Sequence, residues 1–461
     1  MSFTFSVGGT KYVRLTVTDA QSQTASVEHD VSVVAPAPPP PPPPPPPLPP
    51  TPGGSGNTYY VSNSGSDSNP GTSQSSTWKT ISKAQSVLSN LHPGDSVLFK
   101  CGDTWNEEFD LSNIHGVSGN PITIGHYGSN CKLPNQTYTA TLPVINGGST
   151  RQHGFYSGGG ISYIVIDGFD VHDTTMGGIE LQTSSPEPGI IIQNNLVHQV
   201  GAGACSGCGS PHDDGSYNAG LGFRDFTGGS QDGIQILNNT VWDVGGHNTL
   251  GVHYDTSPNL RVSGNLVGPG CLHNCIDTKG VSGVISNNIT TCSSGRGDQC
   301  GAGNAGFYIE NTFASSAKVT YRNNVAYKIG IGFQAEAGGS CASKTGGNCS
   351  ITASYYNNTV FNASAFSFIY SSGRSVDSFD IRNNIFSGAP VRWSGPTTEN
   401  HNDCYGGASC TGSADLSVDP QYVSPGTGDF HLQPNSPVLG NGTNVGLPYS
   451  GSAPDLGAFE R

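Results

Sequence analysis

Short runs of alternating apolar and polar residues recur between residues 189 and 386, and each run carries asparagine near its end. The runs are GIIIQNNLV, GIQILNNTV, NLRVSGNLV, GVISNNIT, KVTYRNNVA, SYYNNTV and FDIRNNIF. Alternation with a period of two is typical of β-strands. The last asparagines of three successive runs, Asn239, Asn265 and Asn288, are 26 and 23 residues apart. A repeat of this length indicates a solenoid in which each coil contributes one run.

Paired asparagines mark the end of most runs, and continuing the alternation puts the first of each pair on the inward side. These residues are Asn194, Asn238, Asn287, Asn323, Asn357 and Asn383. Amides stacked at one corner of successive coils can hydrogen-bond to one another and to the backbone of the turn. The sequence therefore predicts a structural ladder built from the first asparagine of each pair.

A second strand is expected before each asparagine pair, and its inward apolar residues allow these strands to be aligned. The inward residues are Ile179, Phe223, Val252, Ile276, Phe307 and Phe333. Their outward neighbours are Glu180, Arg224, His253 with Asp255, Asp277 with Lys279, Tyr308 with Glu310, and Gln334 with Glu336. Coils stack about 4.8 Å apart, so we expect these side chains to share one polar groove. For a single residue, simple exposure to water is the competing interpretation.

Composition supports an all-β architecture, since the 461 residues include 65 Gly and 32 Pro. The net charge of −14 comes with only 19 Lys and Arg. Without a basic stripe, nucleic acid is not an expected partner, although one cationic pocket or a metal ion could still hold a polyanion. The sequence contains no apolar run long enough to span a membrane. We expect a monomer.

Cysteine usage favours an oxidising compartment and hence a secreted protein. The twelve cysteines fall into the close pairs Cys101/Cys131, Cys205/Cys208, Cys271/Cys275, Cys292/Cys300, Cys341/Cys349 and Cys404/Cys410. Scattered pairs without adjacent histidines do not match a structural zinc site. The opening MSFTFSVGG lacks the basic start of a signal peptide, so we expect the chain to begin inside a longer secreted protein.

Residues 35–56 form a proline run followed by Gly and Ser, which predicts an extended linker. Before it, residues 1–34 contain two alternating strands that resemble the last strands of a PKD-type immunoglobulin-like module. The linker is expected to separate this fragment from a solenoid domain over residues 57–461.

The solenoid part resembles the right-handed parallel β-helix, or pectate-lyase-like, superfamily. The resemblance rests on the segment from Tyr59 to Trp105, on PITIGHYG, and on DFHLQPNSPVLGNGTNVG with PDLGAFE near the end. It implies a short capping helix before the first coil and a secreted, polysaccharide-active protein. The superfamily includes lyases, hydrolases, epimerases and adhesins, so the fold does not specify the activity.

A lyase acting on a uronic-acid polymer is the first of two chemistries that fit the groove. It must remove the weakly acidic proton at C5, for which Lys279 is the candidate base and His253 or Tyr308 the next. Arg224 or Arg296 could bind the substrate carboxylate. The remaining assignments are Asp255, Asp277 and Glu310 as Ca²⁺ ligands, and Glu180, Tyr308, Gln334 and Glu336 as substrate-binding residues. The resemblance implies the combination of lysine and calcium, which is known in the superfamily.

Hydrolysis by a carboxylate pair is the second chemistry, with Asp255, Asp277 and Glu310 as candidates. The GDD signature of polygalacturonase-like hydrolases is missing, and HDDG at 212–215 lies in a cysteine-rich insertion. This absence favours the lyase. A non-catalytic, adhesive solenoid is the third reading, with RGD at 296–298 as a weak indication.

Overall fold

The structure is a computed structural model. It describes residues 9–18, 24–33, 56–183, 188–201, 219–225, 232–245, 248–271, 273–292, 303–311, 316–336, 349–370, 376–393 and 396–461. Within these ranges, only the backbone is described for residues 9–18, 24–33, 183, 224–225 and 253–257. The chain divides into two compact units, Met1–Pro44 and Pro45–Arg461.

The first unit contains an antiparallel hairpin of β1 (Gly9–Thr18) and β2 (Thr24–Val33). These strands lie where the two alternating runs predict them. The hairpin alone does not test the PKD resemblance, which stays a prediction. The division between the units falls inside the predicted linker, residues 35–56.

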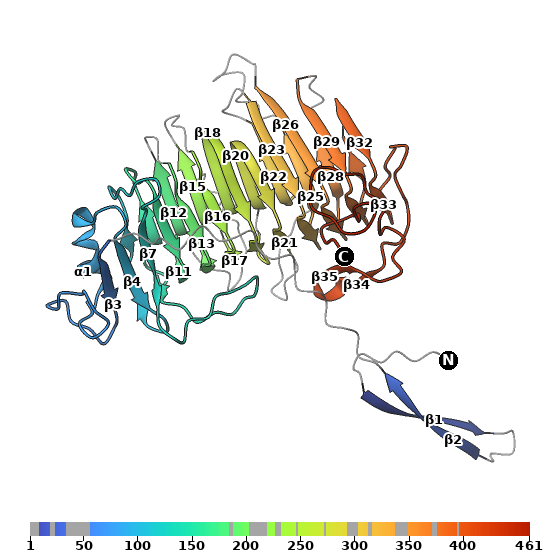
Figure 1. The fold of residues 1–461 in the computed structure, drawn as a ribbon, viewed down its shortest axis with the longest axis horizontal. Coiled ribbons are helices and arrows are strands. Elements are labelled where there is room, and N and C mark those ends of the chain that lie inside the picture. The colour runs from blue at the N-terminus through green and yellow to red at the C-terminus, as the bar shows by residue number, and fades with distance from the viewer. Residues whose placement is uncertain are drawn as a thin grey trace. The chain divides into compact units, whose positions relative to one another are not determined.

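The second unit is a parallel β-helix, in which successive coils add one strand to each of three parallel arrays (Figure 1). Array 1 contains β6 (Phe109–Asp110), β9 (His153–Ser157), β12 (Gly177–Thr183), β15 (Ala219–Asp225), β18 (Asn248–Ser263), β20 (Asn274–Ser286), β22 (Ala305–Glu310), β25 (Ile331–Glu336), β28 (Phe366–Tyr370) and β31 (Val391–Arg392). The predicted all-β, parallel β-helix fold is therefore confirmed.

Array 2 follows array 1 within each coil, and array 3 follows array 2. Array 2 contains β3 (Thr58–Val61), β4 (Ser96–Lys100), β7 (Ile122–Tyr127), β10 (Ile164–Asp167), β13 (Ile191–Gln193), β16 (Gln235–Leu237), β18, β20, β23 (Ser316–Arg322), β26 (Ser350–Tyr356), β29 (Ser378–Arg382) and β32 (Thr397–Asn400). Array 3 contains β5 (Thr104–Trp105), β8 (Val144–Asn146), β11 (Asp170–Thr174), β14 (Leu196–Val200), β17 (Thr240–Val244), β19 (Leu266–Val267), β21 (Ile289–Thr291), β24 (Val325–Tyr327), β27 (Thr359–Phe361), β30 (Ile385–Ser387) and β33 (Asp403–Tyr405). The long strands β18 and β20 run through arrays 1 and 2 and join them.

Inward side chains of the arrays fill the coil interior with stacked apolar rows. In array 1 one row consists of Ile179, Leu221, Leu250, Ile276, Phe307, Phe333 and Phe368. The predicted alignment was wrong for Phe223 and Val252, which belong to the neighbouring inward row with Leu181 and Thr278. Both inward rows are mainly apolar, so moving the alignment by two residues changes neither the alternation nor the side that faces inward. The sequence pattern therefore could not distinguish the two alignments.

An asparagine ladder runs along one corner of the coils, but it is built from the second asparagine of each pair, with Asn265 and Asn402 at the equivalent positions of coils that lack a pair. Its members are fully buried: Asn195, Asn239, Asn265, Asn288, Asn324, Asn358, Asn384 and Asn402. The backbone N–H and the Nδ2 of each donate to the Oδ1 of the next, as from Asn265 to Asn288 at 3.0 and 2.9 Å.

The prediction that the first asparagine points inward was wrong. Asn287, for example, has a φ of 56°, and its equivalents in the other pairs also lie in the left-handed region. Asparagine tolerates this conformation better than most residues. A left-handed residue breaks the strict alternation of an extended strand, so the next side chain turns inward.

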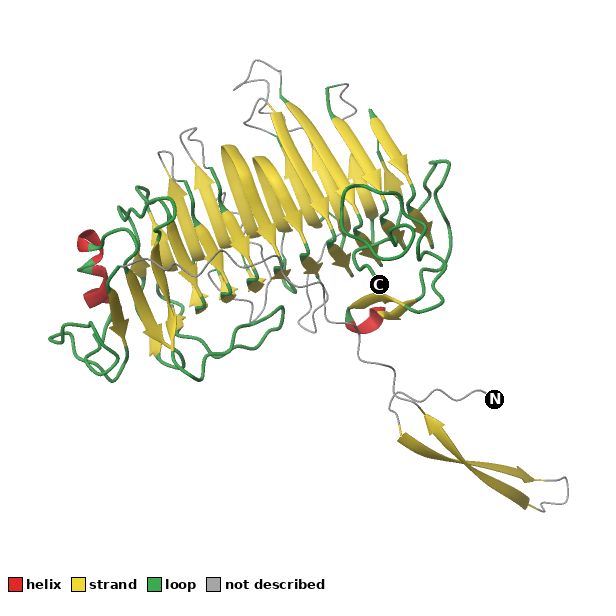
Figure 2. Ribbon diagram, in the orientation of Figure 1, coloured by secondary structure: helices red, strands yellow, loops and turns green. Residues whose placement is uncertain are grey.

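A short helix covers the N-terminal end of the solenoid (Figure 2). At the N-terminal end α1 (Ile81–Gln85) begins after Thr80, whose hydroxyl accepts from the N–H of Lys83, and it is followed by the short 3₁₀ turn Leu88–Asn90. This is the predicted capping helix. Near the C-terminus, the 3₁₀ turn Pro425–Thr427 connects β34 (Tyr422–Ser424) to β35 (Asp429–Leu432), and this hairpin lies against the outer side of array 3. Phe430 and Leu432 pack with Val325 and Ile385 of array 3.

Disulfides join Cys101 to Cys131, Cys271 to Cys275 and Cys404 to Cys410, as predicted. Cys292 and Cys349 are disulfide-bonded, while Cys300 and Cys341 lie outside the described residues, as do Cys205 and Cys208. None of the described helices is long and apolar enough to cross a membrane.

Candidate functional site

Six predicted site residues lie on the outward side of β20, β22 and β25. Register pairing arranges them in two rows across the strands: Lys279, Glu310 and Glu336 in one, and Asp277, Tyr308 and Gln334 in the other. We call these six residues the polar face. Neighbouring strands are about 4.8 Å apart, so side chains within a row are in contact range.

An ion pair occupies the centre of the polar face. The Nζ of Lys279 lies 3.0 Å from Oε2 of Glu310, and both side chains are 15% exposed. The same Nζ lies 6.0 Å from the centre of the Tyr308 ring. The ammonium therefore lies beside both a carboxylate and an aromatic ring, in a site with restricted access to water.

Tyr308 contributes a hydroxyl that remains protonated. Its OH donates to Oε2 of Glu336 at 3.0 Å. Burial raises the pKa of the Tyr308 phenol well above its ordinary value, and the nearby carboxylates of Glu310, Glu336 and Asp277 raise it further. Tyr308 is consequently suited to donate hydrogen bonds and is a poor candidate for the base.

Asp277 is the most enclosed member of the polar face. Its side chain is 0% exposed although it points away from the coil interior, and Nδ2 of Asn274 donates to its Oδ2 at 3.1 Å. The inward neighbour Thr278 donates to the carbonyl of Tyr308 at 2.9 Å. Carboxylates are rarely this deeply buried without a function or a partner that stabilises the charge.

The predicted residues before β20 are placed by their backbone alone. Arg224 pairs with His253, and His253 pairs with Lys279, so these three share a row with Glu310. The predicted alignment of His253 with Asp277 was wrong by two residues. Asp255 follows His253 in the part of β18 where the register against β20 shifts. The side chains of Arg224, His253 and Asp255, and the whole of Arg296, lie outside the described residues.

Glu180 belongs to a separate cluster near the start of array 1, which the sequence did not predict. His153 is 5% exposed and lies between two carboxylates, with Nε2 3.3 Å from Glu180 and Nδ1 3.7 Å from Glu108. Its ring stacks on Tyr156 at 4.7 Å, and Nε2 of Gln182 donates to Glu180 at 2.8 Å. Glu108 and His153 are 45 residues apart, so no local motif could have revealed this cluster.

The described residues do not assemble the predicted calcium site. Calcium takes six to eight oxygen ligands. In the described part of the chain, no group of three metal-ligand side chains includes Asp277 or Glu310, and Glu310 is engaged with Lys279. Because the Asp255 side chain is not described, calcium stays a prediction, and no chemical step is derived through it.

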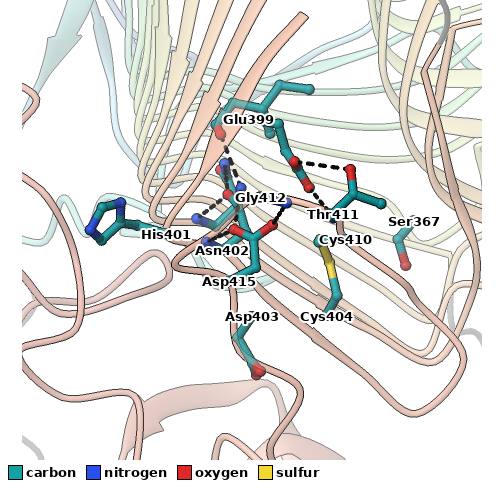
Figure 3. Close-up of a disulfide and its surroundings, with 12 residues drawn as sticks. Ser367, Glu399, His401, Asn402, Asp403, Cys404, Cys410, Thr411, Gly412 and Asp415 are labelled. Carbon is teal, nitrogen blue, oxygen red and sulfur yellow. Dashed lines mark hydrogen bonds between the residues drawn. A yellow bond between two sulfur atoms is a disulfide. The ribbon is translucent and has the colours of Figure 1, made fainter.

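A different acidic group, Glu399 with Asp415, lies beside the Cys404–Cys410 disulfide (Figure 3). Cys410 is oxidised in that disulfide and cannot serve as a thiolate ligand. Asp415 instead accepts the N–H groups of Asn402 and Gly412 at 2.8 and 2.6 Å. Asp415 therefore ends the asparagine ladder, and the group is structural.

Comparisons with known proteins agree with the architecture. No protein-family model matches the chain. The crystal structure of pectate lyase Pel9A has a TM-score of 0.58 and 20% sequence identity, covering 88% of this chain and 96% of that one. The fold is that of pectate lyase Pel9A. At this identity the likeness shows the fold alone.

Two further similarities are weaker or local. An alginate lyase from Paenibacillus sp. str. FPU-7 has a TM-score of 0.44 at 17% identity, covering 78% of this chain and 98% of that one. A lacto-N-biosidase of Bifidobacterium longum subsp. longum is 43% identical over 76 residues. That match spans 16% of this chain and only 5% of the relative's length.

Proposed function

We propose that this protein is an extracellular polysaccharide lyase that cleaves a uronic-acid polymer by β-elimination at the polar face. The observation that carries the proposal is the Lys279–Glu310 pair beside the Tyr308 ring on an outward strand face. The fold shared with a pectate lyase supports it. The disulfides favour an oxidising, extracellular location.

In the proposed reaction Lys279 takes the C5 proton of a uronate, a C4–C5 double bond forms, and the C4–O bond breaks. The departing oxygen takes up a proton from water and leaves as a hydroxyl. An amine can act as this base only when neutral, whereas a lysine paired with a carboxylate is stabilised as the ammonium. Substrate binding must therefore separate Lys279 from Glu310, which lies 3.0 Å away. Tyr308, anchored to Glu336, would donate a hydrogen bond to the sugar.

The substrate carboxylate also needs neutralisation, because the C5 proton is only weakly acidic while the neighbouring group is an anion. In the proposal Arg224 serves this purpose, since its backbone shares a row with Lys279, two strands away. Calcium is the further proposal for the same task. Treatment with a chelator followed by addition of Ca²⁺ distinguishes Arg224 from calcium in this role, because only a metal-dependent enzyme loses and then regains turnover.

The test replaces Lys279 with Ala and with Arg and screens acidic polysaccharides for near-ultraviolet absorbance of the unsaturated product. Both variants should lose about 10²-fold or more in turnover, since general-base catalysis contributes on that scale and arginine stays protonated. Lys318→Ala is the matched control, because this exposed lysine lies in β23 of array 2. An active Lys279→Ala protein would refute the assignment.

A glycoside hydrolase is the second candidate, favoured by the 43% identity with part of a lacto-N-biosidase. Glu310 and Glu336 are register partners on adjacent strands, and hydrolases of this type need two carboxylates flanking the scissile bond. New reducing ends without near-ultraviolet absorbance, abolished by Glu310→Gln but retained by Lys279→Ala, would establish hydrolysis in place of elimination.

A further inference from the structure

A cavity of about 440 Å³ lies on the outer side of array 3, where the C-terminal segment covers the last coils. Its lining includes Ser387, Tyr405, Asp419, Gln421, Tyr422 and Gln433. Figure 1 shows β34 and β35 close to the C-terminal end of the solenoid. The polar face belongs to array 1, so the cavity is a different site.

Two buried hydroxyls lie in the wall of this cavity. They belong to Ser387 and Tyr422, which are 4% and 6% exposed. The Tyr422 ring is fixed by edge-to-face contacts with Phe361 and Phe430 at 5.8 and 5.3 Å. The Tyr422 hydroxyl interacts with the side chains of Ser387 and Thr359, so Tyr422 forms a fixed wall of the cavity.

The rim adds an exposed aromatic ring to these polar groups. Tyr405 is 39% exposed, although it is a large apolar side chain. The amides of Gln421 and Gln433 and the carboxylate of Asp419 supply donors and acceptors around it. Small-molecule sites combine an apolar or aromatic surface with a few polar groups, in volumes of about 300–1,000 Å³.

The charge of the cavity lining favours a neutral sugar over an acidic one. Asp419 is the charged residue of the lining, and the lining contains neither lysine nor arginine. Lys328, whose Nζ donates to the carbonyl of Gly426 at 3.2 Å, is not part of the lining. A uronate would therefore meet a carboxylate without a compensating cation, whereas a neutral sugar could donate its hydroxyls to that carboxylate.

We infer that this cavity is a binding site for a neutral sugar unit of one or two residues, separate from the polar face. The sugar would stack on Tyr405, form hydrogen bonds with the amides of Gln421 and Gln433, and donate a hydroxyl to Asp419. The inference does not depend on the lyase proposal. Such a site would hold the protein on a polysaccharide whose neutral units lie near its substrate.

Ligand-observed NMR of the whole chain with glucose, galactose, mannose, xylose, lactose and galacturonic acid tests the site. At least one neutral probe should bind saturably, and Tyr405→Ala should weaken its affinity tenfold or more. Tyr449→Ala is the control, since Tyr449 is also 39% exposed but does not line the cavity. Equal binding by the two variants overturns the inference, as does the absence of binding by every neutral probe.

Asp419→Asn tests the charge argument separately. The backbone contact with the N–H of Gln421 uses Oδ1 of Asp419 at 3.0 Å, which asparagine retains. The variant should bind galacturonic acid more tightly than the parent does, because the repulsive carboxylate is gone. If the parent protein already prefers galacturonic acid to every neutral probe, the neutral-sugar assignment is wrong. Lys279→Ala should leave the binding of neutral probes unchanged, so failure of the lyase proposal would not be mistaken for failure of this one.

Discussion

Removing one rung of the asparagine ladder gives the most quantitative test of what holds the coils together. The Asn288 side chain makes four hydrogen bonds with neighbouring coils. Its Oδ1 accepts from N–H and Nδ2 of Asn265 at 3.0 and 2.9 Å, and its Nδ2 donates to the Val262 carbonyl and to Oδ1 of Asn324, both at 3.0 Å. Each such bond contributes about 1 kcal/mol net, so Asn288→Ala should cost about 4 kcal/mol of unfolding free energy.

Urea denaturation measures this loss as a lower transition midpoint at an unchanged slope. The matched control is Asn287→Gly at the adjacent position. Asn287 has a φ of 56°, which glycine adopts without steric cost, so this change should cost no more than about 1 kcal/mol. Equal losses at both positions, or a loss below about 1 kcal/mol for Asn288→Ala, would contradict the ladder as a stabilising element.

Three further predictions concern other parts of the chain. Burial, and then the hydrogen bond with Asp415, raises the pKa of Glu399 from 4.5 to about 7. The free energy of unfolding that Glu399 contributes is therefore fully present below pH 4.5 and is lost as the pH rises through 7. Glu399→Gln should therefore melt higher than the parent above pH 7 and not below pH 4.5, and a pH-independent difference would contradict this. Deleting residues 1–56 should leave the melting temperature and any activity nearly unchanged, because the predicted linker isolates the solenoid; a large drop in either would show docking of the N-terminal unit. Mass mapping of a non-reduced digest should pair Cys292 with Cys300, and a different partner for Cys292 would show that the loop is not closed locally.

The coil repeat was predictable because alternation in strands and the recurring asparagine are local in sequence. The contact between Lys279 and Glu310 followed from aligning Ile276 with Phe307, whose register the structure reproduces. The alignment failed at Phe223 and Val252, where either inward row fits the alternating pattern equally well.

Other features depend on conformation or on distant residues. The choice between the two asparagines depends on a left-handed turn residue such as Asn287, which alternation alone does not encode. The enclosure of His153 by Glu108 and Glu180 brings together residues from three strands or loops. The cavity beside Tyr405 needs the C-terminal segment to fold back on array 3. None of these contacts leaves a periodic trace in the sequence.

The asparagine ladder also makes the coil a unit of evolutionary change. Each internal rung presents its Oδ1 as acceptor to the preceding coil and its Nδ2 as donor to the following coil. A whole coil could therefore be duplicated or deleted without leaving an asparagine side chain unpaired. The two end rungs differ, because Asn195 accepts from the backbone N–H of Phe169 and Asn402 donates to the carboxylate of Asp415. Gain or loss of one coil would lengthen or shorten the polar face by one strand spacing, about 4.8 Å. The length of the polar face can thus change in fixed steps while the two ends of the ladder remain the same.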